Sequence, residues 1–241
     1  MEDSRQVTVV GGSSFIGLHL VSQLLDLGIN VNATTRAVRA LTDDPLALLK
    51  QKHPHALNIV AADIQDKDSL AKAFQGSEAI FYLASSVLLQ VNDAFKEQIQ
   101  PTVEGSNNVL EACLCSGSVK TIVITASTYH SRFPKPGYDY SEKDYHVVDA
   151  ATEFPYVQAK VQEERDIWDF QKEHSTRFRI TVINPSFVFG PEVLGQSQFT
   201  CLNSPCTNLG RNLLANYLTG NWKRIPQGMP DYVFNLTVQA T

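Results

Sequence analysis

The sequence predicts an α/β protein with a doubly wound parallel sheet, and three observations support this. A short apolar strand at residues 7–10 runs directly into a glycine turn and then into a segment with helical periodicity. Further short apolar strands alternate with helical segments along the chain, as in parallel sheets covered on both faces. Polar or small residues follow several of these strands directly, at the ends where such sheets bind ligands.

The turn after the first strand contains Gly11 and Gly17, six residues apart. Glycine lets the backbone turn tightly and approach a pyrophosphate, whose charge would meet N–H groups at the helix start, around Phe15 and Ile16. Ser14 stands where the Gly-x-x-Gly-x-x-Gly pattern has its middle glycine, which keeps a donor near the phosphate but adds a Cβ. The turn predicts a dinucleotide site, with a purely structural β–α turn as the alternative.

The composition limits the classes of function. With 241 residues and 43% hydrophobic residues, the chain suits one large globular domain, or one domain with an appendage. A net charge of −5 argues against nucleic-acid or anionic-membrane partners. We see no secretory signal and no apolar run of the ~20 residues that a membrane span needs, so we expect a cytoplasmic protein. Four cysteines in a chain this long predict neither a disulfide framework nor a metal site.

The second strand, predicted at residues 29–35, ends at Arg36, nineteen residues after Gly17. An acidic residue near this position would bind the ribose 2′-hydroxyl of NAD, but none is present. The planar donors of a guanidinium suit a 2′-phosphate instead, so NADP is favoured over NAD. Arg39 is a rival for this role, and a solvated loop arginine is the alternative.

The middle of the chain repeats the strand–helix alternation. Strands predicted at 57–62, 79–83 and 121–125 end near Asp63, near Ala84 and Ser85, and near Ser127, while helices are predicted at 46–52, 69–74 and from Pro101 to about 116. Asp63 could equally be a plain loop cap. The irregular segment 129–152 follows, where Tyr138, Tyr140 and Tyr145 either line a site or pack in a surface loop.

A long helix is then predicted from Tyr156 to about 174, with Pro155 in its first turn. Tyr156 and Lys160 are four residues apart and therefore share one helical face. A strand at 179–183 leads into Asn184, Pro185 and Ser186, and glycine and proline residues soon afterwards mark the exit from the main sheet. A further helix is predicted at about 209–218.

These motifs, in this order, resemble the extended short-chain dehydrogenase/reductase family of the NAD(P)-dependent epimerase/dehydratase superfamily. The segments that carry the resemblance are VVGGSSFIG, NATTR, AADIQD, IFYLAS, PTVEGSNNVLEAC, TIVITAS, FPYVQAKVQEE and INPSFVFGP, which cover nearly all of residues 7–191. The sequence is most similar to the dihydroflavonol-reductase-like branch of NADPH-dependent aldehyde and ketone reductases. The resemblance implies a Rossmann-type fold.

The resemblance also implies roles for individual residues. Tyr156 would protonate a carbonyl oxygen as hydride arrives, and Ser127 would hydrogen-bond that oxygen. Lys160 would bind the nicotinamide ribose, and its charge would favour ionisation of the tyrosine at neutral pH. Coenzyme contacts are expected at Gly11, Ser14, Phe15, Ile16, Gly17, Arg36, Asp63, Ile64, Leu83, Ala84, Ser85, Tyr156, Lys160, Pro185 and Ser186.

We therefore expect a coenzyme domain at residues 1–190 and a small, truncated substrate lobe at residues 191–241, whose pocket would be open to water. The expected function is NADPH-dependent reduction of a small-molecule aldehyde or ketone by Ser127, Tyr156 and Lys160, in a monomer or homodimer. An NAD-linked nucleotide-sugar epimerase or dehydratase is an alternative, although no acidic pair accompanies Ser127. The other alternative is a non-catalytic dinucleotide-binding regulator or an inactive short form.

Overall fold

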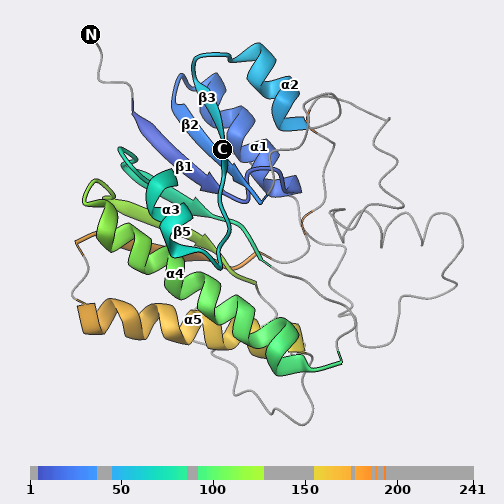
Figure 1. Ribbon diagram of the computed structural model, residues 1–241, viewed down its shortest axis with the longest axis vertical. Helices are drawn as coiled ribbons and strands as arrows, with labels where there is room; N and C mark the ends of the chain where they lie inside the picture. Colours follow the sequence, from blue (N-terminus) through green and yellow to red (C-terminus); the bar gives the residue numbers. More distant parts are fainter. Residues whose placement is uncertain are drawn as a thin grey trace, which may run out of the picture.

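Six parallel strands form one sheet in the order β3-β2-β1-β4-β5-β6 (Figure 1). The computed structural model describes residues 5–36, 45–85, 92–127, 155–174, 177–185, 188 and 193. The strands are β1 (Gln6–Val10), β2 (Asn30–Thr35), β3 (Leu57–Ala61), β4 (Ala79–Tyr82), β5 (Thr121–Thr125) and β6 (Arg179–Ile183). The predicted parallel, doubly wound α/β sheet is confirmed.

Helices cover both faces of this sheet, as Figure 1 shows. On one face lie α1 (Phe15–Asp26) and α2 (Pro45–Lys52), and on the other lie α3 (Lys67–Ala73), α4 (Gln100–Ser116) and α5 (Pro155–His174). The chain forms two hydrophobic cores because successive side chains of a strand point to opposite faces. In β1, Val9 belongs to the core beneath α1 and α2, and Val10 belongs to the core beneath α3, α4 and α5.

A polar side chain of β1 is also buried in the sheet, and its hydrogen bonds are satisfied. The hydroxyl of Thr8 donates to the carbonyl oxygen of Ala73 at 3.0 Å and lies 2.8 Å from the hydroxyl oxygen of Ser77. Buried hydroxyls are tolerated when they are bonded in this way. These contacts attach the end of α3 to the centre of the sheet.

The helical path into α4 begins earlier than the sequence predicts. The five residues before α4 form a π-helical segment, η1 (Phe95–Ile99), and Pro101 follows in the first turn of α4. A proline within a helix donates no N–H, and its ring crowds the carbonyl four residues before it. The wider π-helical turn relieves that crowding, which allows helical backbone on both sides of Pro101.

Several sequence predictions lie outside the described residues: the tyrosines of 129–152, Arg39, Ser186, the helix at 209–218 and, apart from Val193, the lobe at 191–241. In the described ranges, no helix is both long enough and apolar enough to cross a membrane.

Candidate functional site

Most of the predicted site residues that the structure describes follow the carboxyl ends of the strands, at one edge of the sheet. All six strands are parallel, so their carboxyl ends meet at that edge. β1 lies between β2 and β4, which makes this the point where the chain order reverses and where open α/β sheets bind ligands. Gly11 and Ala84 follow the neighbouring strands β1 and β4, whose register pairs Val10 with Tyr82.

The turn after β1 requires glycine for steric reasons. Gly11 has a φ of +86°, and a Cβ built on it would lie 2.9 Å from the backbone nitrogen of Ala84. The N–H of Gly11 donates to the Thr34 hydroxyl at 3.2 Å, and the N–H of Gly12 donates to the Thr34 carbonyl at 3.1 Å. A Cβ on Gly17 would collide with the carbonyl oxygen of Gly11. The turn is therefore held tightly between β2 and β4.

Ser14 has a structural role that the sequence did not reveal. It is the N-cap of α1, and its Oγ accepts a hydrogen bond from the Gly17 N–H at 3.1 Å. Its backbone angles, φ −72° and ψ 166°, suit any residue, so replacing the middle glycine with serine causes no backbone strain. The first N–H groups of a helix have no partner within it. The Ser14 hydroxyl is the acceptor for the Gly17 N–H. The N–H groups of Phe15 and Ile16 have no backbone partner among the described residues.

Arg36 and Asp63 follow the neighbouring strands β2 and β3. Arg36 is exposed at the tip of β2. The Asp63 Oδ1 accepts a hydrogen bond from the Gln65 N–H at 2.9 Å, so the carboxylate caps its own loop, as one of the sequence interpretations allowed.

Ile64 packs against α4 rather than standing free. A Cβ on Gly105 of α4 would lie 2.7 Å from the Ile64 Cδ1, so glycine makes room for this side chain. The Ile64 carbonyl also accepts a hydrogen bond from the Asn108 Nδ2 at 2.9 Å. These contacts hold the loop after β3 against α4.

The segment after β4 lies beside the glycine turn. The Leu83 N–H donates to the Val10 carbonyl at 2.9 Å, and Ser85 is exposed. At the far strand, Pro185 is partly buried directly after Asn184. Leu83, Ser85 and Pro185 thus follow the carboxyl ends of β4 and β6.

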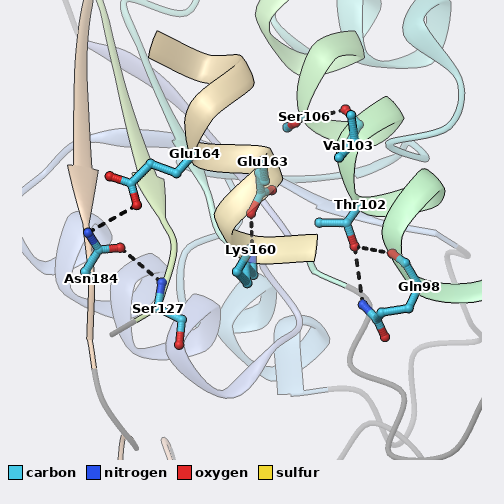
Figure 2. Close-up of polar contacts among 9 residues, drawn as sticks. All are labelled: Gln98, Thr102, Val103, Ser106, Ser127, Lys160, Glu163, Glu164 and Asn184. Carbon is cyan, nitrogen blue, oxygen red and sulfur yellow. Dashed lines mark hydrogen bonds and ion pairs between the residues drawn. The ribbon is translucent and has the colours of Figure 1, made fainter. Parts of the chain in front are cut away.

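Ser127 is held in place by a neighbouring strand. The register pairs Thr125 with Ile183, so the residues that follow β5 and β6 lie side by side. The Asn184 Oδ1 accepts a hydrogen bond from the Ser127 N–H at 3.1 Å, and the Asn184 Nδ2 donates to the Glu164 Oε2 at 3.5 Å (Figure 2). Ser127 is thereby connected through Asn184 to α5, the helix that carries Tyr156 and Lys160.

Lys160 is buried and paired with a carboxylate three residues along the same helix. Its Nζ lies 2.7 Å from the Glu163 Oε2, and the two side chains are 3% and 0% exposed (Figure 2). Burial alone would lower the pKa of Lys160, but the charges of Glu163 and Tyr156 and the hydrogen bond to Glu163 outweigh it and raise that pKa. Lys160 is therefore a charged ammonium, and Tyr156 lies within its electrostatic reach.

The other oxygen of this carboxylate lies in the interior near Tyr82 of β4. The Glu163 Oε1 and the Tyr82 hydroxyl are both buried, and neither has a hydrogen-bond partner in the part of the chain that the structure describes. The two groups still influence one another: burial raises the pKa of Tyr82 well above 10.0, and Glu163 adds to that rise. Burial also raises the pKa of Glu163, which Lys160 and Tyr82 only partly offset.

Sequence reasoning missed Glu163, Glu164, Asn184 and Tyr82 as neighbours of the predicted catalytic residues. A partial signal was present, because Glu163 is three residues from Lys160 and residues at that spacing are neighbours on a helix. Burial of the pair depends on how α5 packs on β4, which no local pattern encodes. The position of Asn184 beside Ser127 follows from the pairing of β5 with β6, which the sequence does not specify.

Comparisons with known proteins identify a family model and several relatives that match most of the chain. Residues 7–204 match the model of the NAD dependent epimerase/dehydratase family. Anthocyanidin reductase from Arabidopsis thaliana is 32% identical over 79% of this chain and 58% of its own. A bifunctional dihydroflavonol 4-reductase/flavanone 4-reductase from Pyrus communis is 33% identical over 78% of this chain and 56% of its own. The chain thus spans just over half the length of these two curated relatives.

A solved structure with the same fold comes from Candida albicans. It is the crystal structure of Gre2 in complex with NADPH, 28% identical, with a TM-score of 0.72 over 87% of this chain and 65% of that chain. Since the family match extends over most of the sequence, the chain belongs to the NAD dependent epimerase/dehydratase family and is a distant relative of dihydroflavonol, anthocyanidin and Gre2-type reductases.

Proposed function

We propose that the protein binds NADPH and reduces the carbonyl group of a small aldehyde or ketone to an alcohol. The observation that carries this proposal is the buried, charged Lys160 beside Tyr156, on a helix that Asn184 connects to Ser127. The names of the relatives support it, because they are reductases and the Candida albicans structure contains NADPH. In this proposal residues 1–190 form the coenzyme domain and residues 191–241 contribute to the substrate side.

The carboxyl edge of the sheet fits a dinucleotide. Close packing excludes side chains from the glycine turn: at Gly11 and Gly12 by the segments of Ala84 and Ala33, and at Gly17 by the turn itself. The N–H groups of Phe15 and Ile16 at the start of α1, which have no backbone partner among the described residues, suit a pyrophosphate, and the exposed Arg36 suits a 2′-phosphate. Bound there, NADPH supplies the hydride for reduction.

The residues of the chain supply the other parts of the chemistry. The Ser127 hydroxyl would donate a hydrogen bond to the substrate carbonyl oxygen and orient it. The Tyr156 hydroxyl would give its proton to that oxygen as the alcohol forms. The Lys160 ammonium would bind the ribose nearest the reacting ring and stabilise negative charge on the tyrosine oxygen.

A turnover assay tests this assignment. We expect NADPH oxidation, followed by absorbance, with some members of a panel of aldehydes and ketones. Tyr156→Phe should lower kcat/KM by roughly 100-fold or more, because a positioned general acid contributes about that much, and NADPH affinity should change little. If NADPH binds but no carbonyl compound in the panel is reduced, a dinucleotide-binding regulator is the better assignment.

Coenzyme choice is a separate test of Arg36. A hydrogen-bonded charge pair contributes about 1.5–3 kcal/mol, so Arg36→Leu should weaken NADPH binding by roughly ten- to a hundredfold. NADH lacks the 2′-phosphate, so its affinity should be the same for both forms. A wild-type protein that binds NADH more tightly than NADPH would show that the role given to Arg36 is wrong.

A further inference from the structure

We propose that Glu163 is a positioning residue, whose carboxylate fixes both the place and the charge of Lys160 in the coenzyme site. The proposal rests on the function proposed above, because it assigns Lys160 to coenzyme binding. It adds a residue that does not itself touch substrate or coenzyme.

The burial of the pair makes the carboxylate necessary. The helix carries a second lysine–carboxylate pair at the same spacing, Lys172 with Asp169 at 2.8 Å, but those side chains are 75% and 63% exposed. Water solvates the exposed pair, so neither member depends much on the other. Lys160 and Glu163 have almost no exposure, and a buried ammonium without a partner is strongly disfavoured. Among the described residues, Glu163 is the acidic partner of Lys160.

Few other groups act on this pair. The titratable groups that influence Lys160 and Glu163 are Tyr82 of β4 and Tyr156 and Glu164 of α5. η1 and α4 also pack against α5, and none of the titratable groups that act on Lys160 or Glu163 comes from the described residues of these two elements. Among the described residues, Lys160 forms the well-defined hydrogen bond to Glu163, at 2.7 Å, while the buried Tyr82 hydroxyl acts on the same carboxylate more weakly. Lys160 is therefore the principal partner of Glu163.

Removing only the charge of Glu163 separates positioning from packing. Glu163→Gln keeps the size of the side chain and one oxygen acceptor for the ammonium. It removes the negative charge that offsets the cost of burying the Lys160 ammonium. The pKa of Lys160 should therefore fall, because Glu163 is the larger of the two charges that raise it. Lys160 would then lose its proton, and its grip on the coenzyme, at lower pH than in the wild-type protein.

The experiment is a titration of the full chain with NADPH across pH, followed by fluorescence and without substrate. At about pH 6 we expect Glu163→Gln to bind NADPH within roughly threefold of wild type, since Lys160 is still charged. At about pH 9 we expect its affinity to be at least roughly tenfold weaker than that of wild type. Glu163→Asp, which restores the charge on a shorter side chain, should place the alkaline fall in affinity between those of Glu163→Gln and wild type. Asp169→Asn removes the exposed pair and should reproduce the wild-type curve.

Other outcomes contradict the proposal in distinguishable ways. A loss of affinity that is the same at every pH would indicate a merely structural role for Glu163, and tighter binding by Glu163→Gln would indicate competition for Lys160. If Glu163→Gln does not fold, Glu163→Asp decides: its shorter side chain should shift the alkaline fall part of the way, and an unshifted curve overturns the proposal. A wild-type protein that binds no NADPH at any pH refutes the proposed function and this inference together, whereas normal wild-type binding with unshifted variants refutes the inference alone.

Discussion

Single glycines in this protein differ in what they do, and two of them separate backbone strain from close packing. Gly11 and Gly28 both have positive φ angles, +86° and +74°. A Cβ on Gly28 would meet nothing within 4 Å, whereas one on Gly11 would press against the backbone of Ala84. We expect Gly28→Ala to lower the free energy of unfolding by about 1–2 kcal/mol, from strain alone.

Gly11→Ala should cost more than Gly28→Ala, by about 1–3 kcal/mol further, because β1 and β4 must also shift apart. Urea denaturation of the two variants and the wild type measures both effects. The same experiment should show NADPH affinity falling for Gly11→Ala and staying constant for Gly28→Ala, which lies at the opposite edge of the sheet. Equal losses of stability would mean that the contact with Ala84 does not constrain the turn.

At the scale of elements, one asparagine joins two strands and a helix. Asn184 follows β6, accepts a hydrogen bond from Ser127 after β5 and donates one to Glu164 of α5. Asn184→Ala leaves the buried Ser127 N–H without that partner, so we expect a loss of about 1–3 kcal/mol in unfolding free energy. Turnover should fall as Ser127 loses its orientation, and hydrogen exchange at the Ser127 amide should accelerate.

A second asparagine provides the control for this prediction. Asn58 also bridges neighbouring strands, because its Nδ2 donates to the Asn32 Oδ1 at 3.2 Å, but it is exposed to water. Asn58→Ala should change the unfolding free energy by less than about 0.5 kcal/mol. If both asparagine variants lose the same stability, burial of the Ser127 amide is not what makes Asn184 important.

The elements themselves were predictable to different degrees. The six strands were found within a residue or two of their predicted ends, because most are short runs of apolar or β-branched residues that end in polar or small residues. The entry to α4 was not predicted, because Pro101 is typical of a helix start and the sequence has no signature for a π-helical turn before it. At the site, strand ends were predictable, whereas Asn184 and Glu163 depend on register and on packing between distant segments.

At the scale of the whole molecule, three buried groups stay protonated in the folded protein to higher pH than in the unfolded chain. This difference predicts how the stability of the protein changes with pH. Burial raises the pKa of the Cys113 thiol far above its usual 9.0. The pKa of Tyr82 is likewise raised above 10.0, by burial and by Glu163. For Lys160, its neighbours' charges outweigh burial and raise the pKa above 10.5. All three groups therefore keep their protons in the folded state at pH values where the unfolded chain releases them.

The sign of the effect follows from this difference. Below about pH 9 the Cys113 thiol is protonated in both states and contributes no pH dependence. As pH rises past 9.0, only the unfolded chain loses this proton, so the free energy of unfolding should fall by about 1.4 kcal/mol per pH unit. Tyr82 and then Lys160 should steepen the fall above their own usual values, because they too stay protonated only in the folded chain.

Urea denaturation between about pH 8 and 11, followed by circular dichroism, measures this slope. Between about pH 9 and 10, Cys113→Ala should reduce the slope of unfolding free energy against pH by the contribution of close to one proton. The smaller side chain should also lower the stability itself. Cys115→Ala, which removes the exposed thiol two residues along the same helix, should leave the slope as in the wild type. A Cys113→Ala slope equal to that of the wild type would mean that the interior beneath α4 admits the charged thiolate, contrary to the close packing of Cys113 between α4 and the sheet.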